Sequence, residues 1–308
     1  MRLSDDRTLF NAYIKQASSY FDIAPEYIEK DYWLMEILKE LFSKDLPYVF
    51  KGGTSLSKCY RLINRFSEDI DISYSCPFAG INAGLKNRLF KGITKSIKSV
   101  GLEILNKDEL RRNAYFNQYV CPYDSLLLNT AIDKKVVVEL AGQTPSFPTN
   151  KLKIQSFIGQ YFDITGRHNL TIEYGLEEFD IIVQSLSRTL VDKVFAICDY
   201  YLSNKTSKHS RHLYDLNKIV SALELNQEIA NIFKEVREYR KQIVICKSAK
   251  DGVKLHEILS LIISTHSFEE DFNLITKPLL YEEIQYSECE KSLIKIRDFL
   301  RENNIKLF

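Results

Sequence analysis

The chain has 308 residues, of which 45% are hydrophobic and 27% are charged, and its formal net charge is +1. A chain of this length can build one large domain or two ordinary ones, each with its own core. The small net charge excludes a protein that attracts nucleic acid through its overall field, so local basic patches would have to hold such a partner.

The chain has no sequence signature of export, zinc binding or membrane insertion. Its six cysteines are scattered and form no CxxC or Cys/His cluster, which indicates reduced thiols. The N-terminus opens with charged residues instead of an apolar signal core. No apolar stretch reaches the roughly 20 residues that a membrane-spanning helix requires. These features predict a soluble cytoplasmic protein with no membrane partner.

The first hundred residues predict helices that alternate with two short strands. Ser4 is expected to cap the first helix, and Pro25 stands at the start of the second. The predicted elements are helix 4–20, helix 24–42, strand 46–50, a helix that opens at residue 54, strand 66–74 and a basic helix over 83–100.

The pattern changes to strand-like between residues 102 and 163 and to helical from about residue 186. Strands are expected over 114–120, 126–132 and 135–140, with a proline-containing loop over 143–150. We therefore predict an α+β fold with two domains. Residues 1–185 form an α/β domain with a mixed sheet, flanking helices and N-terminal helices, and residues 186–308 form a helical domain.

Asp69 and Asp71 are the most informative pair of residues. On a strand, residues i and i+2 project from the same face, about 6–7 Å apart along the chain. Two carboxylates in this arrangement can bind Mg²⁺, which prefers a few carboxylates together with substrate phosphates. An isolated Asp-x-Asp also occurs on solvated edge strands, so its sequence context decides between these interpretations.

That context is a glycine turn one helix upstream. Gly52 and Gly53 follow a strand and precede Thr54 and Ser55 at a helix start. Glycines let the backbone approach a phosphate closely, and the first amides of a helix are hydrogen-bond donors. The order strand, Gly-Gly-Ser/Thr, helix, strand, Asp-x-Asp resembles the core of the DNA polymerase β-like nucleotidyltransferase superfamily.

That superfamily usually recruits a third carboxylate from a neighbouring strand. Glu139 interrupts the apolar run 136–140 and is the best candidate, because a buried, unpaired acid would cost several kcal/mol. Asp133 is the competing choice, and a partly exposed edge position is the structural alternative for Glu139.

The resemblance extends to a narrower family, the AbiEii/MenT nucleotidyltransferase toxins of bacterial toxin–antitoxin and abortive-infection systems. Two segments carry the opening motifs, Lys51-Gly-Gly-Thr-Ser-Leu-Ser-Lys58 and Arg65-Phe-Ser-Glu-Asp-Ile-Asp71. Two later segments, Arg188-Thr-Leu-Val-Asp-Lys193 and Arg211-His-Leu-Tyr-Asp215, are similar to the family's later motifs. The resemblance spans about residues 30–225.

The resemblance implies roles for individual residues. Asp69 and Asp71 would bind two Mg²⁺ ions, with Mn²⁺ as an alternative. Lys193 would contact the triphosphate of the nucleotide, and Asp215 would complete or support the catalytic site. The implied substrate-binding residues in the segments that contain the opening and later motifs are Lys51, Gly52, Gly53, Thr54, Ser55, Arg65 and Arg211.

Each of these roles has a plain alternative in the sequence. Lys193 lies in an apolar helix, where an ammonium group is unusual, but it could also be a surface lysine paired with Asp192 or Asp199. Asp215 could form a helical ion pair with Arg211 at i−4. His209 and His212 flank a basic segment and are interpreted as RNA-facing or structural.

The implied reaction transfers a nucleoside monophosphate from an NTP to RNA, with the 3′ end of tRNA as the expected acceptor, which would block translation. A cognate antitoxin encoded nearby is the expected partner. Two rival functions are a transferase acting on a small molecule or a protein hydroxyl, and a catalytically inactive nucleotide-binding module.

Three groups of basic residues could contact RNA phosphates, and each could equally be a solvated surface. They are Lys91, Lys95 and Lys98; Lys107, Arg111 and Arg112; and Lys205, Lys208 and Arg211.

Overall fold

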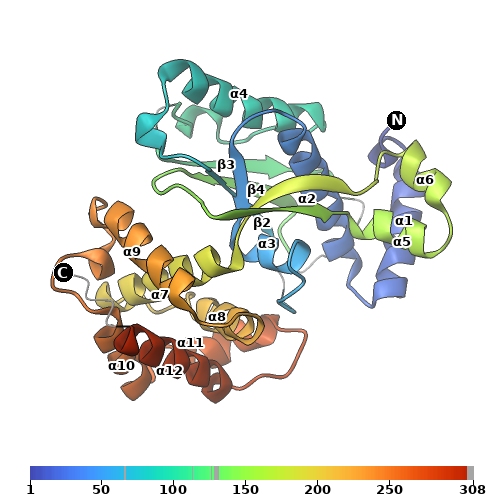
Figure 1. Ribbon diagram of the computed structural model, residues 1–308. Coiled ribbons are helices and arrows are strands. Elements are labelled where there is room, and N and C mark those ends of the chain that lie inside the picture. The colour runs from blue at the N-terminus through green and yellow to red at the C-terminus, as the bar shows by residue number, and fades with distance from the viewer. Residues whose placement is uncertain (66, 113, 126, 128–131, 304–308) are drawn as a thin grey trace. The chain divides into compact units, whose positions relative to one another are not determined.

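The computed structural model describes residues 1–65, 67–112, 114–125, 127 and 132–303. Its internal contacts divide the chain into two compact units, coloured by chain position in Figure 1. Unit 1 comprises Met1–Cys59, Glu68–Pro145 and Thr149–Val183, and unit 2 comprises Tyr60–Ser67, Ser146–Pro148 and Gln184–Phe308.

Within the described residues, unit 1 holds a six-stranded mixed sheet in the order β3-β4-β2-β1-β6-β5 (Figure 1). Its strands are β1 Tyr48–Lys51, β2 Asp69–Tyr74, β3 Phe116–Pro122, β4 Lys135–Ala141, β5 Thr149–Ile154 and β6 Phe179–Gln184. Strand β2 runs antiparallel to β1 and parallel to β4. Strand β1 is also parallel to β6, and β3 is antiparallel to β4. This mixed sheet with its helices confirms the predicted fold class.

The helices of unit 1 surround a core in which α2 is the most buried. They are α1 Arg7–Phe21, α2 Pro25–Phe42, α3 Gly52–Lys58, α4 Ala83–Ser99, α5 Phe157–Ile164 and α6 His168–Glu173, with short 3₁₀ turns η1 Leu3–Asp5, η2 Phe78–Gly80 and η3 Lys107–Glu109. Helix α2 contacts α1, α4, α5 and strands β2 and β4. Residues 28–38 of α2 are all buried, charged ones included, so this helix is a central element of the unit.

Two local predictions for unit 1 were wrong, and side-chain capping explains both. Asp6 caps α1 by accepting hydrogen bonds from Thr8 and Leu9 amides, whereas Ser4 lies in the preceding 3₁₀ turn. The strand-like pattern expected up to residue 163 is wrong at α5. There the Ser156 hydroxyl accepts a hydrogen bond from the Gly159 amide and caps the start of a helix. The predicted strand over 126–132 falls mostly on residues outside the described ranges.

Unit 2 is helical throughout its described C-terminal part, as the sequence predicts. Its helices are α7 Leu186–Leu202, α8 Arg211–Ala222, α9 Gln227–Lys241, α10 Leu255–Ser264, α11 Glu269–Asp271 and α12 Tyr286–Glu302, with 3₁₀ turns η4 Lys247–Ala249 and η6 Lys277–Leu279 and a π-helical turn η5 Phe272–Thr276. Helix α7 contacts α8, α9 and α10, and α12 contacts α8 and α10. Helix α7 is therefore the hub of this unit.

Over the described residues, none of the helices is both long enough and apolar enough to cross a membrane.

Candidate active site

Asp69 and Asp71 lie on one face of β2, as the alternation of the sequence predicts. They are partly exposed, whereas Ile70 and Ile72 between and after them are fully buried on the opposite face. Asp71 stands beside Lys51 of β1 on one side and beside Glu139 of β4 on the other. Directly paired residues of adjacent strands project to the same face, so this face of the sheet carries several charged groups.

Gly52 makes room for the Asp71 carboxylate. Its φ is +78°, a left-handed conformation that glycine adopts without steric cost. A Cβ atom at this position would overlap with the carboxylate oxygen of Asp71. The first glycine of the Gly-Gly turn is therefore required for two reasons, backbone conformation and close approach to the carboxylate.

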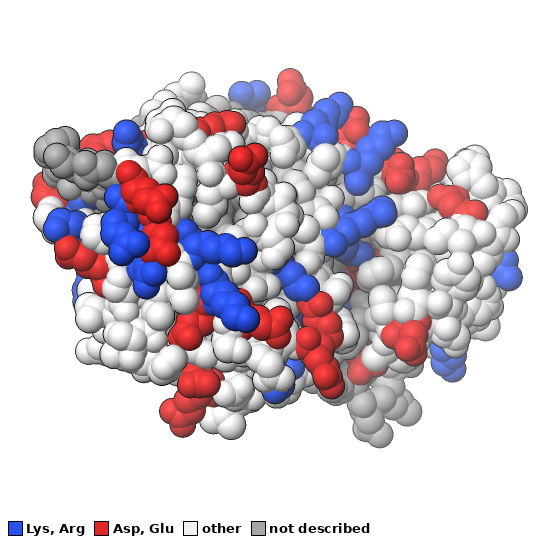
Figure 2. Space-filling view, turned by 60° about the horizontal axis from the view of Figure 1, so that its bottom comes forward, with Lys and Arg blue, Asp and Glu red and all other residues white. Residues whose placement is uncertain are grey.

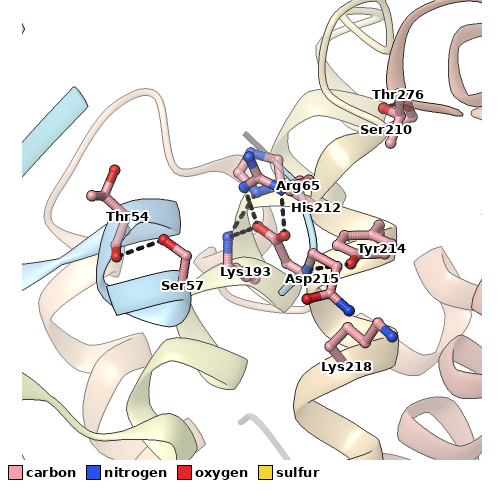
Figure 3. A network of polar contacts seen from close by, with 12 residues as sticks. Thr54, Ser57, Arg65, Lys193, Ser210, His212, Tyr214, Asp215, Lys218 and Thr276 are labelled. Atoms are coloured by element: carbon pink, nitrogen blue, oxygen red, sulfur yellow. Dashed lines mark hydrogen bonds and ion pairs between the residues drawn. The ribbon is translucent and has the colours of Figure 1, made fainter. Parts of the chain in front are cut away.

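The hydroxyl groups after the glycines hold the turn in place. Thr54 and Ser55 are buried, and they donate hydrogen bonds to the carbonyls of Asp69 (2.6 Å) and Gly52 (2.8 Å). Ser57 donates to the Thr54 carbonyl at 3.0 Å (Figure 3). The Thr54 bond fastens α3 to β2, and the other two bonds lie within α3. Phosphate binding by Thr54, Ser55, Lys51 and the glycines stays a prediction.

Glu139, the predicted third carboxylate, is the pairing partner of Asp71 on the neighbouring strand β4. Its side chain, however, is hydrogen-bonded to strand β3 and not to β2. Its Oε1 accepts a hydrogen bond of 2.8 Å from Gln118 Nε2 on β3, on the opposite side of β4 from β2. The competing residue, Asp133, is exposed and paired with Lys135. Among the described residues, no three His, Cys, Asp or Glu side chains form a group that could bind a metal ion. A metal role for Glu139 therefore stays a prediction.

The carboxylate pair itself fits a hard divalent cation. Asp69 and Asp71 offer oxygen ligands from one strand face, and the absence of a side chain at Gly52 gives the Asp71 carboxylate the room it occupies. Mg²⁺ is usually bound by one or two carboxylates while substrate phosphates and water complete its coordination. The residues of unit 1 are consistent with this chemistry.

A buried ion pair that the sequence did not predict holds the C-terminal end of α3, the helix that contains the glycine turn. Lys58 at the end of α3 forms an ion pair with Asp31 of α2, and its ammonium lies 3.5 Å from the centre of the Phe157 ring. Asp31 also accepts a hydrogen bond of 2.7 Å from the Phe157 amide. The sequence does not predict this contact, because strand β1 separates α2 from α3 along the chain.

Asp215 is the centre of a second polar group, which lies in unit 2. Arg65 binds its carboxylate with two parallel hydrogen bonds of 2.8 Å, and Lys193 donates a third of 2.6 Å (Figure 3). Asp215 is fully buried, and Arg65 and Lys193 are each 7% exposed. The structure thus brings together three residues that the sequence singled out in three separate segments.

Burial and charge pairing control protonation in this group. Burial alone would raise the pKa of Asp215, but Arg65 and then Lys193 outweigh it and hold that pKa far below its ordinary value. Burial is also the largest effect on Lys193 and lowers its pKa, while Asp215 offsets only part of this effect. Two cations therefore bind the same buried carboxylate.

His212 adjoins this group as a neutral acceptor. Its Nδ1 lies 3.4 Å from Lys193 Nζ, and burial followed by the charge of Lys193 lowers the pKa of the imidazole well below its ordinary value. A neutral imidazole can accept from the ammonium only through a nitrogen without a proton. Nδ1 is therefore the acceptor, and the ring proton is on Nε2.

The segment that carries Arg65 belongs to unit 2 and is held there by hydrogen bonds of its backbone. The amide of Asn64 donates to the Tyr214 hydroxyl at 2.8 Å, and the amide of Tyr281 donates to the Asn64 carbonyl at 2.8 Å. Arg65 also forms a β-bridge with Leu280. Substrate binding by Arg65 stays a prediction, and the structure adds a second role for it as a clamp on Asp215.

The predicted basic groups all lie on the surface of their units. Figure 2 shows lysine and arginine side chains interspersed with acidic ones, which agrees with the net charge of +1. The exposed cations are Lys91, Lys95 and Lys98 on α4; Lys107, Arg111 and Arg112; and Lys205, Lys208 and Arg211.

The mixed sheet and its surrounding helices are consistent with the α+β fold of a nucleotidyltransferase. A family model described as nucleotidyl transferase AbiEii toxin, Type IV toxin–antitoxin system, matches residues 36–299. This match covers most of the chain, so the protein belongs to the AbiEii family of nucleotidyltransferase toxins. The family uses an NTP and implies a cognate antitoxin, and nucleotidyltransferases generally use divalent metal ions. No curated protein matches the chain.

Proposed function

We propose that the protein transfers a nucleoside monophosphate from an NTP to RNA, at the 3′ end of tRNA, and thereby blocks translation. The observation that carries this proposal is the pair Asp69 and Asp71 on one strand face, with the Asp71 carboxylate packed against the backbone of Gly52. Membership of the AbiEii family supports the class of reaction. The acceptor is the part of the proposal that requires a direct test.

Asp69 and Asp71 would hold Mg²⁺, or Mn²⁺ in its place, with Glu139 as a further ligand. A metal bound there would lower the pKa of the attacking hydroxyl and stabilise charge on the departing pyrophosphate. The amides of the turn after Gly52 would orient the phosphates, as glycine-rich turns do elsewhere.

Lys193 would contact the triphosphate and offset the negative charge that develops during transfer. The carboxylate of Asp215, clamped by Arg65, fixes the position of the ammonium before substrate binds. This preorganisation matters because a cation already in place does not have to be ordered during the reaction. Arg211 is an exposed cation that would contact RNA or nucleotide phosphate.

A cytoplasmic protein that uses tRNA and NTP fits this activity, with an antitoxin encoded nearby as its partner and abortive infection as one biological outcome.

The acceptor can be identified by offering competing substrates. Purified protein with Mg²⁺ and each α-labelled NTP is incubated with total tRNA, with cell protein and with small molecules, in parallel with Asp69→Ala. We expect label in tRNA with wild type alone. Label in protein or small molecules instead would favour the rival transferase, and NTP binding without turnover in both proteins would favour the inactive module.

A growth assay tests the biological role. Expression of wild type should arrest growth and extend tRNA 3′ ends, whereas Asp69→Ala should do neither. Arrest by both proteins would show that catalysis is not its cause.

A further inference from the structure

Three ring side chains of unit 2 lie nearly parallel to one another next to Lys193. Tyr200 of α7 and His209 of the following loop stack with centroids 3.6 Å apart and planes tilted by 6°. The His212 ring lies 5.7 Å from Tyr200 and 6.2 Å from His209, tilted by less than 20° to each. All three residues are partly exposed, so the stack reaches the surface.

Cations border this stack. Burial is the main reason that the pKa of His209 is lowered, and the charges of Arg211 and Lys205 lower it further. Arg211 also lowers the pKa values of His212 and Lys193, after burial and nearer charges. Arg211 therefore adds positive charge at the stack and at Lys193.

The loop that presents His209 is held in one conformation. The carboxylate of Asp271 accepts hydrogen bonds from the amides of Lys208 (2.6 Å) and Ser210 (3.0 Å). The Ser210 hydroxyl bonds to that of Thr276 at 2.7 Å. The backbone of Lys208, with φ +66°, is thereby fixed. A ring on such a loop is positioned before any ligand arrives.

His209 also carries an unsatisfied polar atom. Its Nδ1 is buried and has no hydrogen-bond partner within the described part of the chain. Buried polar atoms without partners are rare in folded proteins and often mark sites completed by a ligand or by water. Packing alone does not explain an imidazole at this position, because an apolar ring would stack there without leaving a nitrogen unpaired.

We propose that Tyr200 and His209 form a stacking platform for an unpaired base near the 3′ end of the acceptor RNA. The phosphates of that strand would be contacted by Lys205, Lys208 and Arg211. Single-stranded RNA is bound elsewhere by aromatic and histidine rings beneath its bases and by basic residues along its backbone. This inference rests on the proposed RNA acceptor and adds the surface that receives it.

Charge distribution favours RNA over the NTP as the ligand of the stack. The nucleotide triphosphate is a compact group of charges, and the proposed function assigns it to the buried Lys193. Lys205, Lys208 and Arg211 are exposed and recur every three residues along the loop. Such an extended row suits the repeated phosphates of a strand better than one nucleotide.

Binding of RNA without NTP tests the platform directly. A fluorescently labelled single-stranded RNA is titrated with full-length wild type, His209→Ala and Tyr200→Leu, and binding is followed by anisotropy. Loss of one stacked base should weaken binding by about 5- to 100-fold. His209→Phe, which keeps a ring but lacks the Nδ1 atom, should bind more tightly than His209→Ala and less tightly than wild type. His256→Ala on α10 is the matched control and should behave as wild type.

A base deletion in the RNA identifies the stacked position. An abasic nucleotide is placed in turn at each of the last residues of the strand. At the stacked position, the abasic RNA and His209→Ala should each weaken binding, and together they should weaken it no further, because they remove the same contact. Steady-state kinetics should show a raised KM for RNA in His209→Ala, with the KM for NTP unchanged.

The outcomes separate this inference from the proposed function. Wild type that labels RNA, with ring variants equal to it in affinity and KM, would overturn the platform alone. A raised KM for NTP only would place the nucleotide base on the stack and also overturn it. Ring-dependent RNA binding with label entering only another acceptor would support the platform and overturn the proposed acceptor.

Discussion

The carboxylate of Asp71 and the backbone of Gly52 occupy one small space, and this leads to a prediction for Gly52→Ala. The substitution adds backbone strain of about 1–2 kcal/mol at positive φ and pushes a methyl group into the carboxylate. We expect nucleotide transfer to fall by more than tenfold, because the metal ligand is displaced. Initial rates with labelled NTP measure this effect.

Gly101→Ala is the matched control. Gly101 has a similar φ of +84°, but a Cβ there would meet nothing within 4 Å. It should therefore lose comparable stability and keep its activity. If both variants lost activity equally, strain alone would explain the loss, and the carboxylate would not be involved.

Arg65 provides a second test at the scale of single residues. Arg65→Met leaves Asp215 with Lys193 alone in a buried place, and removing one partner of a buried ion pair typically costs about 3–5 kcal/mol. Arg65→Lys keeps the charge but loses the two parallel bonds, so its cost should be smaller. Urea unfolding measures both, with the exposed Arg301→Lys as control. Equal stability of Arg65→Met and wild type would contradict the clamp.

The neutral state of His212 gives stability a pH dependence. Its folded pKa lies below the unfolded value of about 6.5, so the unfolded chain takes up a proton that the folded chain excludes. Stability should therefore fall as pH drops below about 6.5, by up to about 1.4 kcal/mol per pH unit from this group. In His212→Gln, the free energy of unfolding should change less between pH 6.5 and 5.5 than it does in wild type. In His256→Gln, this pH dependence should equal that of wild type.

Individual residues also show how far the sequence could predict the site. Period-two alternation places Asp69 and Asp71 on one face, because that rule is local. The bond between Arg65 and Asp215 joins residues 150 positions apart, and no local pattern encodes such a contact. Tyr200 and Asp271 were missed for the same reason, since each acts through residues on another element.

At the scale of secondary-structure elements, α8 begins without a side-chain cap of its own. Asp271 of α11 partly replaces this cap, because its carboxylate accepts hydrogen bonds from the amides of Lys208 and Ser210 just before the helix. We expect Asp271→Ala to speed hydrogen exchange in the loop before α8 and to destabilise unit 2 by about 1.5–3 kcal/mol, the range for bonds to a charged group.

Hydrogen exchange followed by mass spectrometry on peptides covering residues 203–212 measures this change. Glu270→Ala, at the exposed neighbouring position of α11, serves as the control. Unchanged exchange in Asp271→Ala would mean that the loop is held by other contacts.

The predicted boundaries of helices and strands are accurate where the hydrophobic period and the residues that break it indicate the same limits. Helix α2 and strands β2 and β4 lie within one or two residues of their predicted ends at most boundaries, because each has a clear period and a polar or glycine stop. Strand β5 was not predicted as a separate strand, because its first two residues fall in the expected loop over 143–150 and the rest lie inside the strand-like stretch over 102–163. Its alternation of lysine with apolar residues is too short to mark its limits.

On the scale of the whole molecule, positive and negative charges nearly cancel, and the face drawn in Figure 2 carries side chains of both signs. RNA affinity should therefore depend on local cations. Three phosphate contacts by Lys205, Lys208 and Arg211 predict a slope of about −2 for log affinity against log salt with single-stranded RNA. Replacing Lys205 and Lys208 by glutamine should reduce the slope by more than half.

Anisotropy titrations at several salt concentrations measure these slopes. Lys254→Gln and Lys277→Gln together remove two exposed cations from other parts of unit 2 and form the control. An equal reduction by the control pair would show that the overall field, and not the loop, binds the RNA.

The assignment of Tyr60–Ser67 and Ser146–Pro148 to unit 2 has a consequence for synthesis. The polypeptide passes from one unit to the other five times, after residues 59, 67, 145, 148 and 183. Arg65 leaves the ribosome 150 residues before Asp215, and until then its guanidinium must remain in water. A chain that ends before residue 215 therefore lacks the clamped lysine. During synthesis the clamp can form only after Asp215, which is residue 215 of 308, has been added.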